Sequence, residues 1–373
     1  MNLIRLKEVC LVFLRLGCIA FGGPAAHIAM MQEELVEKRK WMSEENFLDM
    51  VGATNLVPGP NSTQMTMHCG HVRAGVPGLI VAGLSFILPA VFFTLLLAIL
   101  YVEYGEVPSI APFFYGIKPA VIGIILNATF KLGKKAFKGW QLWVLGLTVA
   151  IMSFVGWNEF LLIIGGGLVG MIWLGLDKKN VKIIGIAPMM LLLKSVSVGI
   201  TNTSIFFSFL KIALVLFGSG YVLIAYVDAE LVTKLGWLSK QELLDAIAMG
   251  QFTPGPVLTT ATFIGYQLKG ISGALWASLG MFLPSFFLVG LLVKLIPLLR
   301  KSKLLSSFLD AVNACAVGIM IAVTIQLGYD IGGQWQSLLL MAVSVFIVLK
   351  FPRLSPIWII LGGGLLGYIL LLF

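Results

Sequence analysis

The sequence has little charge and few of the residues that build enzyme sites. Only 12% of its 373 residues are Asp, Glu, Lys or Arg, whereas 59% are hydrophobic. Apolar runs of about 18 residues or more, the length that crosses a bilayer, recur along the chain. The shortage of charge therefore excludes a soluble enzyme and predicts an all-α polytopic membrane protein.

Metal, disulfide and nucleotide signatures are also missing. The four cysteines lack the paired spacing of a disulfide framework or a zinc site: Cys10, Cys18, Cys69 and Cys315. His68 and His71 share a helix face, but without clustered acids polar packing is favoured over a metal site. No Walker A lysine motif, HExxH or nucleophile elbow occurs, so we expect neither an enzyme nor a cofactor.

The formal charge of +9 comes from 26 Lys and Arg residues against 17 acids. These basic residues stand mostly in short segments between apolar runs, where they set membrane orientation. We therefore expect membrane lipid as a partner and no nucleic acid.

An internal repeat divides the chain into two halves. A shift of 196 residues superimposes Phe21-Gly22 on Phe217-Gly218 and Pro58-Gly59-Pro60 on Pro254-Gly255-Pro256, and after a one-residue gap the shift becomes 195. The predicted units are an N-terminal repeat (1–176), a linker (177–202) and a C-terminal repeat (203–373). The apolar periodicity predicts helices at 8–31, 46–70, 76–102, 110–130, 140–155 and 159–176, matched by 203–227, 242–266, 271–297, 305–327, 335–349 and 355–373.

Loop charges predict that the two halves are inverted. Four lysines place loop 131–139 on the cytoplasmic side of the membrane. The charged residues of loop 103–109 are both acidic, so this loop belongs on the outer side and helix 76–102 runs outward. Lys294, Arg300 and their basic neighbours place the end of the matched helix 271–297 inside. Opposite crossings of matched helices are the plan of many secondary transporters.

Two topologies satisfy this inversion. In one, 46–70 and 242–266 are re-entrant, which leaves Arg5 and Lys7 outside. In the other, both segments span and the linker crosses as an extra helix. We expect a multi-pass protein of the plasma membrane, and both topologies place its C-terminus outside the cell.

The repeated Pro and Gly residues predict broken helices. Breaks at membrane depth are tolerated where protein or a wet cavity covers them, and the half-helices then offer unpaired N–H donors that suit an anion. The alternative is that these residues only kink packed helices. The predicted backbone and polar site residues are Gly22, Gly23, Pro24, Pro58, Gly59, Pro60, Asn61, Ser62, Thr63, Gln64, Phe217, Gly218, Pro254, Gly255 and Pro256.

Three cations add to this anion hypothesis. Arg15 and Lys211 occupy equivalent positions in the first apolar segment of each half, where a charge is costly unless it has a function. Snorkelling to the interface is the alternative reading. Lys118 is matched by Asn313 and is a third candidate ligand.

Two other repeated features have structural readings. Asp49 and Asp245 follow Ser43 and Ser239, and we interpret them as helix starts rather than proton relays. The glycines at 165–170 and 362–367 predict close helix packing.

At these motifs the sequence resembles the chromate transporter family in its long form with two fused halves. The matching text includes Phe21 to Pro24, Pro58 to Thr63 and Pro254 to Pro256. The resemblance implies chromate transport, usually efflux that confers resistance, with sulfate as a similar oxyanion. Where the family pattern often has an acid after Asn-Ser-Thr, this chain has Gln64.

The membrane potential favours export. A divalent anion that moves outward gains about 4.6 kcal/mol per 100 mV, twice the single-charge value. The leading hypothesis is therefore an oxyanion exporter. Sulfate uptake, a scaffold or a channel are alternatives, and a homodimer is left open.

Overall fold

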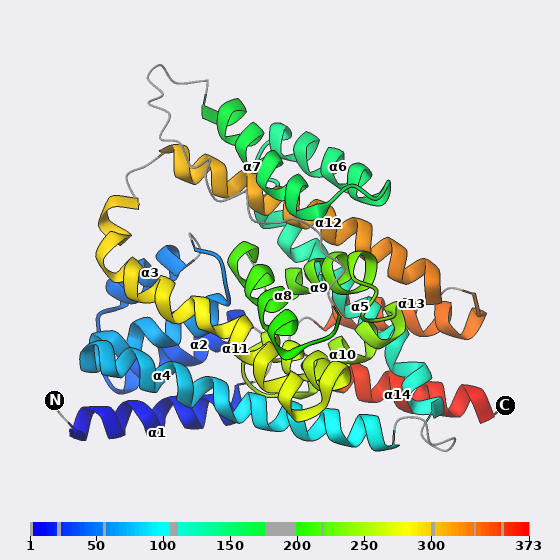
Figure 1. Ribbon diagram of the computed structural model, residues 1–373, viewed down its shortest axis with the longest axis horizontal. Coiled ribbons are helices and arrows are strands. Elements are labelled where there is room, and N and C mark those ends of the chain that lie inside the picture. Colours follow the sequence, from blue (N-terminus) through cyan, green and yellow to red (C-terminus); the bar gives the residue numbers. More distant parts are fainter. Residues whose placement is uncertain are drawn as a thin grey trace.

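The computed structural model is built from helices. It describes residues 3–20, 24–54, 57–104, 111–175, 199–217, 220–299, 303–331, 333–351 and 354–372, and within these ranges it contains no strand. The all-α fold predicted from the sequence is confirmed (Figure 1). Phe21, Gly22, Gly23, Gly218 and nearly all of the linker lie outside the described residues.

The helices of the first half follow the apolar segments. They are α1 (Leu3–Ile19), α2 (Pro24–Met31), the π-helical η1 (Gln32–Lys38), α3 (Glu44–Thr54), α4 (Asn61–Tyr104), α5 (Ala111–Ala136), α6 (Trp140–Phe154) and α7 (Glu159–Gly175). Helix α5 continues six residues beyond the end predicted at 130, so basic residues that we had assigned to a loop belong to its last turns.

The second half repeats this order. Its elements are α8 (Asn202–Val215), the 3₁₀ turn η3 (Gly220–Val222), α9 (Leu223–Val227), the π-helical η4 (Asp228–Lys234), α10 (Lys240–Phe252), the 3₁₀ turn η5 (Val257–Thr259), α11 (Thr260–Leu299), α12 (Lys303–Ile331), α13 (Trp335–Lys350) and α14 (Pro356–Leu372). The shift of 196 residues places η1 on η4 end to end, so even this rare helix type is repeated.

Two of the helices are folded back on themselves. In α4 the chain turns at Ala74 and Gly75, where the Gly75 φ is 67°, and in α11 it turns at Lys269 and Gly270, where the φ is 59°. A positive φ is accessible to glycine at little cost, so each turn falls on a glycine. The turns separate the helices predicted on either side of 71–75 and 267–270.

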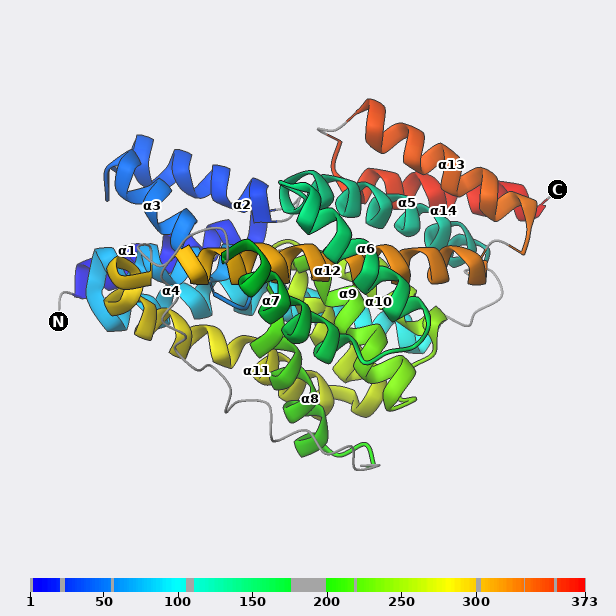
Figure 2. The ribbon, with the colours of Figure 1, turned by 90° about the horizontal axis from the view of Figure 1, so that it is seen from above.

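The two halves exchange their C-terminal helices. Helix α5 packs against α13 and α14 of the other half, and α12 packs in the same way against α6 and α7, while α5 and α12 also touch each other (Figures 1 and 2). In both views α5 and α12 run in opposite directions along the long axis. The halves are therefore interwoven rather than placed side by side.

Glycines make these exchanged contacts close. A Cβ on Gly116 of α5 would lie 2.1 Å from the Gly363 carbonyl oxygen, and one on Gly170 of α7 would lie 2.3 Å from the Ala311 Cβ. The close packing predicted at the two glycine clusters is confirmed. Small residues let membrane helices approach in this way.

The outer surface is strongly apolar. Exposed Leu, Ile, Phe and Trp side chains cover the long helices, as lipid contact requires. Three stretches of the described chain are long and apolar enough to cross a bilayer: Asn61–Tyr104, Val257–Leu291 and Ser306–Asp330. Because α4 is folded, residues 61–73 form a separate arm of about 20 Å, shorter than a bilayer core of about 30 Å.

Substitutions of two helical glycines test the exchanged packing. We expect Gly116→Ala to lower the free energy of unfolding by about 1–3 kcal/mol, because the added methyl overpacks the α5–α14 contact. Gly165→Ala is the control, since no atom lies within 4 Å of the methyl that it adds. Thermal unfolding of the purified protein in detergent measures both. Equal melting temperatures for the two variants would contradict the packing argument.

Candidate functional site

The site is built around two loops that interrupt helices at Pro58-Gly59-Pro60 and Pro254-Gly255-Pro256. The chain leaves helical geometry between α3 and α4 and again between α10 and α11, as predicted. The φ angles of Gly59 and Gly255 are 118° and 87°, in the region that favours glycine. Prolines on each side lack N–H donors and restrict the loop further.

Each loop is hydrogen-bonded to the other half of the protein. The Gly59 N–H donates to the Leu216 carbonyl at the end of α8 (2.6 Å), and the Gly255 N–H donates to the Ala20 carbonyl at the end of α1 (2.8 Å). The two acceptors lie at the ends of α1 and α8, the first helix of each half. Both helices end well before the ends of the apolar segments predicted at 8–31 and 203–227. The loops therefore supply donors to carbonyls at the ends of the two broken helices, and the His27 Nε2 also lies 3.0 Å from the Ala20 carbonyl.

The loops also pack against equivalent positions of the long helices. A Cβ on Gly255 would lie 2.8 Å from the Ala90 Cβ, and one on Gly59 would lie 3.0 Å from the Ser285 Oγ. Gln64 supports the first loop, because its Nε2 donates to the Pro58 carbonyl (2.6 Å). Gln64 thus has a structural contact within the loop.

A cavity of about 1000 Å³ lies beside these loops. Its walls come from both halves, mainly from α5 and α12. The polar residues and the broken-helix residues of its wall are Pro24, Asn61, Asn127, Lys131, Lys135, Lys138, Phe217, Tyr221, Ser306, Asp310, Asn313 and Ser355. This volume is many times that of one water molecule, so the space, which we call the vestibule, is large enough for a hydrated anion.

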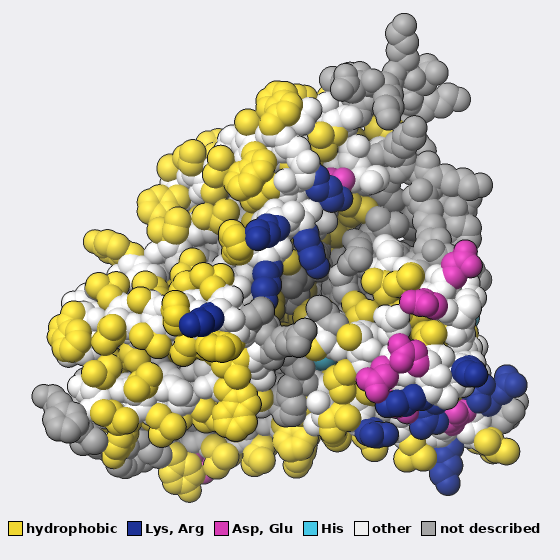
Figure 3. Space-filling view, turned by 180° about the vertical axis from the view of Figure 1, so that it is seen from behind, with side chains coloured by type: hydrophobic (Ala, Val, Ile, Leu, Met, Phe, Trp, Pro, Cys, Tyr) yellow, Lys and Arg dark blue, Asp and Glu magenta, His cyan; other side chains and the backbone are white. Residues whose placement is uncertain are grey.

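The wall of the cavity carries a positive excess. The wall has three lysines and one aspartate, which give a formal charge of +2. Lys138 is paired with Asp310 (2.7 Å), whereas Lys131 and Lys135 form no ion pair with any described residue. Figure 3 shows basic side chains gathered beside a hollow in this face. Low-dielectric walls focus such a field and raise the local concentration of anions.

The structure brings some of the predicted residues to this cavity and keeps others away. Pro24, Asn61 and Phe217 lie on its wall. Buried positions in or beside the two loops hold Gly59, Pro60, Ser62, Thr63, Gln64, Pro254, Gly255 and Pro256, while Pro58 is partly buried. These residues do not line the cavity.

The three predicted cations do not line the cavity. Arg15 is exposed on α1. Lys118 pairs with Asp245 (3.2 Å), and Lys211 donates to Glu230 while its Nζ lies 4.0 Å from the Phe160 ring centroid. Lys118 and Lys211 are therefore each compensated by a buried carboxylate.

Sequence reasoning missed the lysines that do line the cavity. Lys131, Lys135 and Lys138 were placed in a cytoplasmic loop, but α5 extends to Ala136 and presents the first two on one face at i and i+4. This spacing was the available signal. Asn127, one turn earlier, belongs to the same wall.

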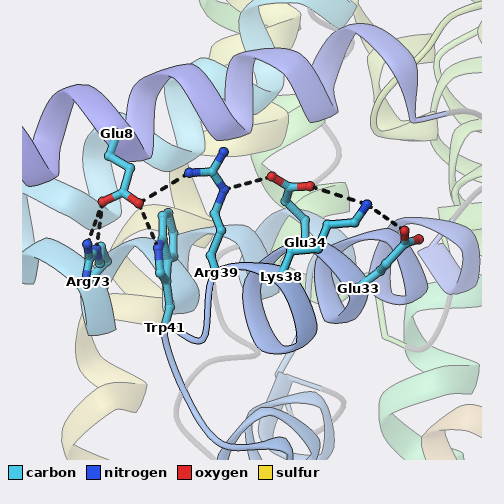
Figure 4. A network of polar contacts seen from close by, with 7 residues as sticks. All are labelled: Glu8, Glu33, Glu34, Lys38, Arg39, Trp41 and Arg73. Atoms are coloured by element: carbon cyan, nitrogen blue, oxygen red, sulfur yellow. Dashed lines mark hydrogen bonds and ion pairs between the residues drawn. The ribbon is translucent and has the colours of Figure 1, made fainter.

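A polar network fixes the π-helical segment η1 to the surrounding helices (Figure 4). Its members are Glu8, Glu33, Glu34, Lys38, Arg39, Trp41 and Arg73. Glu8 of α1 accepts from the Arg73 guanidinium beside the α4 turn (2.6 Å) and from the Trp41 indole (3.1 Å). At its exposed end the hydrogen bond from Lys38 lowers the pKa of the Glu33 carboxyl.

Comparison with known proteins agrees with this arrangement. The family model described as "Chromate transporter" matches residues 7–171 and 203–368, one copy on each half. The chain belongs to the chromate transporter family. It is similar to the chromate transport protein of Cupriavidus metallidurans (31% identical, 98% of this chain and 93% of that protein) and to a probable chromate transport protein of Synechococcus elongatus (32%, 87% and 84%). No solved structure matches.

Two glycine variants test the loops of this family member. Gly255→Ala combines a strained φ with crowding against Ala90, so we expect a lower melting temperature, with a loss of about 2–4 kcal/mol for strain and overpacking together. Gly156 has a similar φ of 92° but open space around the position of a new methyl. Gly156→Ala should therefore lose only the stability that the strained φ costs. If thermal unfolding gives both variants the same loss, the loop is not tightly docked on α4.

Proposed function

We propose that the cavity is the entrance and binding vestibule of a chromate exporter in the plasma membrane, with a role in chromate resistance. The observation that carries this proposal is the positive cavity that reaches Asn61 and Pro24, the first residues of α4 and α2. Helix N-termini offer N–H donors and a partial positive charge to an anion. The relatives named as chromate transport proteins supply the substrate class.

The proposed route begins at the lysines. Lys131 and Lys135 attract the divalent anion into the vestibule, where it stays hydrated because the space is wide. It then meets Asn61, whose neighbours Ser62, Thr63 and Gln64 form the first turn of α4. Gly22, Gly23 and Gly218, which the sequence also predicts for this site, lie outside the described residues.

The two halves are proposed to be inverted in the membrane. The opposite directions of α5 and α12 in Figures 1 and 2 support this topology, as do the positive-inside charges that put Lys131 and Lys135 in the cytoplasm. The vestibule then opens to the cytoplasm, where an exporter loads. The inside-negative potential drives a dianion outward by about 4.6 kcal/mol per 100 mV.

Neutralising the vestibule lysines tests this function. We expect Lys131→Gln with Lys135→Gln to raise the half-saturating chromate concentration by about tenfold, the lower end of the effect of focused charge. Lys134→Gln is the matched control, because Lys134 is exposed on the same helix but does not line the cavity. The assay is chromate uptake into inverted vesicles that contain the purified protein, with and without an imposed potential.

Two outcomes of this assay would contradict the proposal. If the double variant and Lys134→Gln behave alike, the cavity is not on the transport path. If flux fails to saturate, the protein is a channel or scaffold. Competition by sulfate measures how far the site distinguishes the two oxyanions, and faster uptake into right-side-out vesicles than into inverted ones would replace the exporter by an importer.

A further inference from the structure

A buried ion pair joins the two halves away from the cavity. The Lys118 Nζ of α5 lies 3.2 Å from the Asp245 Oδ2 of α10, and the Tyr101 hydroxyl donates to the same oxygen (2.6 Å). The Asp245 side chain is only 5% exposed and that of Lys118 is 21% exposed. Three helices from both halves therefore meet at one carboxylate.

This carboxylate is poorly satisfied for a buried charge. Its Oδ2 accepts both bonds, while its Oδ1 is buried and has no hydrogen-bond partner among the residues that the structure describes. Buried pairs pay a desolvation cost that ideal geometry and further hydrogen bonds must offset. The pair is thus held in place by the packing of α10 more than by its own bonds, and a displacement of α10 would release it.

The repeat contains a second region equivalent to the α5–α10 interface, between α12 and α3, and there the helices are apart. Helix α10 packs against α5 and α14 around this pair. The equivalent helix α3 packs mainly against α4 and η1, and Val51 of α3 and Asn313 of α12 instead lie on the wall of the cavity. Asn313 is the residue that the repeat matches to Lys118. The same interface is therefore closed in one place and open in the other.

The pair lies toward the end of α5 that is remote from the vestibule lysines. Thirteen residues separate Lys118 from Lys131, which corresponds to about 20 Å along a helix. Tyr101 comes from the last turn of α4, at the same end. The ion pair therefore lies at the opposite end of α5 from the open cavity.

We propose that Lys118 and Asp245 form the gate of this opposite side, and that Lys118 becomes an anion-binding residue once the gate opens. The inference rests on the proposed carrier function. When α10 moves away from α5, Lys118 lines an open cavity on its own side, as Asn313 now does on the other side. The Lys118 ammonium then releases the Asp245 carboxylate and binds the transported anion. Asn313 is uncharged and cannot form an ion pair, so the two sides differ in how strongly they close.

Cysteine labelling measures the gate without requiring transport. The four native cysteines are replaced by alanine and Asn313→Cys reports the open cavity through its reaction rate with a maleimide. Breaking the gate by Asp245→Asn should favour the opposite-facing state and slow this labelling by about fivefold. Tyr101→Phe, a milder change, should slow it less. The charge swap Lys118→Asp with Asp245→Lys should restore the rate.

The control is Asp330→Asn, which breaks an exposed ion pair between Asp330 and Lys240 of the same α10 (3.0 Å). It should leave the labelling rate unchanged. If Asp245→Asn and Tyr101→Phe both fold and label like the control, the pair is not a gate. This conclusion stands even if the protein carries no chromate.

Sided flux measures the second role of Lys118. Relative to Asp245→Asn, which opens the same gate but keeps the ammonium, Lys118→Gln should raise the half-saturating chromate concentration by about tenfold when chromate is presented on the side opposite the cavity, and by less than about twofold on the cavity side. An equal change on both sides, or no change, would show that Lys118 does not bind the anion. Vesicles of both orientations provide the two measurements.

Discussion

The structure depends on backbone hydrogen bonds that cross between the halves at the two broken-helix loops. Gly59 donates to Leu216 and Gly255 donates to Ala20, so each half completes the interrupted first helix of the other. A carbonyl left unpaired at membrane depth, away from the water of the cavity, would cost several kcal/mol. The His27 Nε2 also lies 3.0 Å from the Ala20 carbonyl, so the bonds between the halves stabilise the breaks in α1 and α8 together with contacts inside each half. This constraint explains why glycine stands at both loop centres and why the halves are interwoven rather than independent.

The functional features arise where the repeat loses its symmetry. The backbone plan is shared, from the matched π-helical segments to the turns at Gly75 and Gly270. The side chains differ: in the repeat Lys118 corresponds to Asn313, and Ala90 corresponds to Ser285. One α5–α10 interface is closed, while the related region between α3 and α12 holds the cavity. A fold with two equivalent interfaces, of which one is closed, is what the proposed carrier would need in order to open first one side and then the other.

The sequence predicted the helices and their interruptions well, because apolar length and repeated Gly and Pro depend on local chemistry. It placed the break at Pro58 to Pro60 and the glycine contacts of α7 and α14 correctly. It could not reveal the exchange of α5 and α12 between the halves, because a repeat does not state which copy a helix packs against. For the same reason it did not pair Lys118 with Asp245. The cavity lysines were missed because an end of α5 rich in lysine has the composition of a loop.

The pairing of the membrane cations bears on selectivity. Lys211 is compensated by Glu230 and Lys118 by Asp245, so neither leaves a free charge in the closed protein. The uncompensated charge of the vestibule is instead carried by Lys131 and Lys135, on its wet wall where a lysine costs little. An anion that enters must therefore be attracted at long range before any close contact forms. Such attraction doubles for a divalent anion relative to a monovalent one, so under the proposed function the vestibule would concentrate a dianion such as chromate more than chloride.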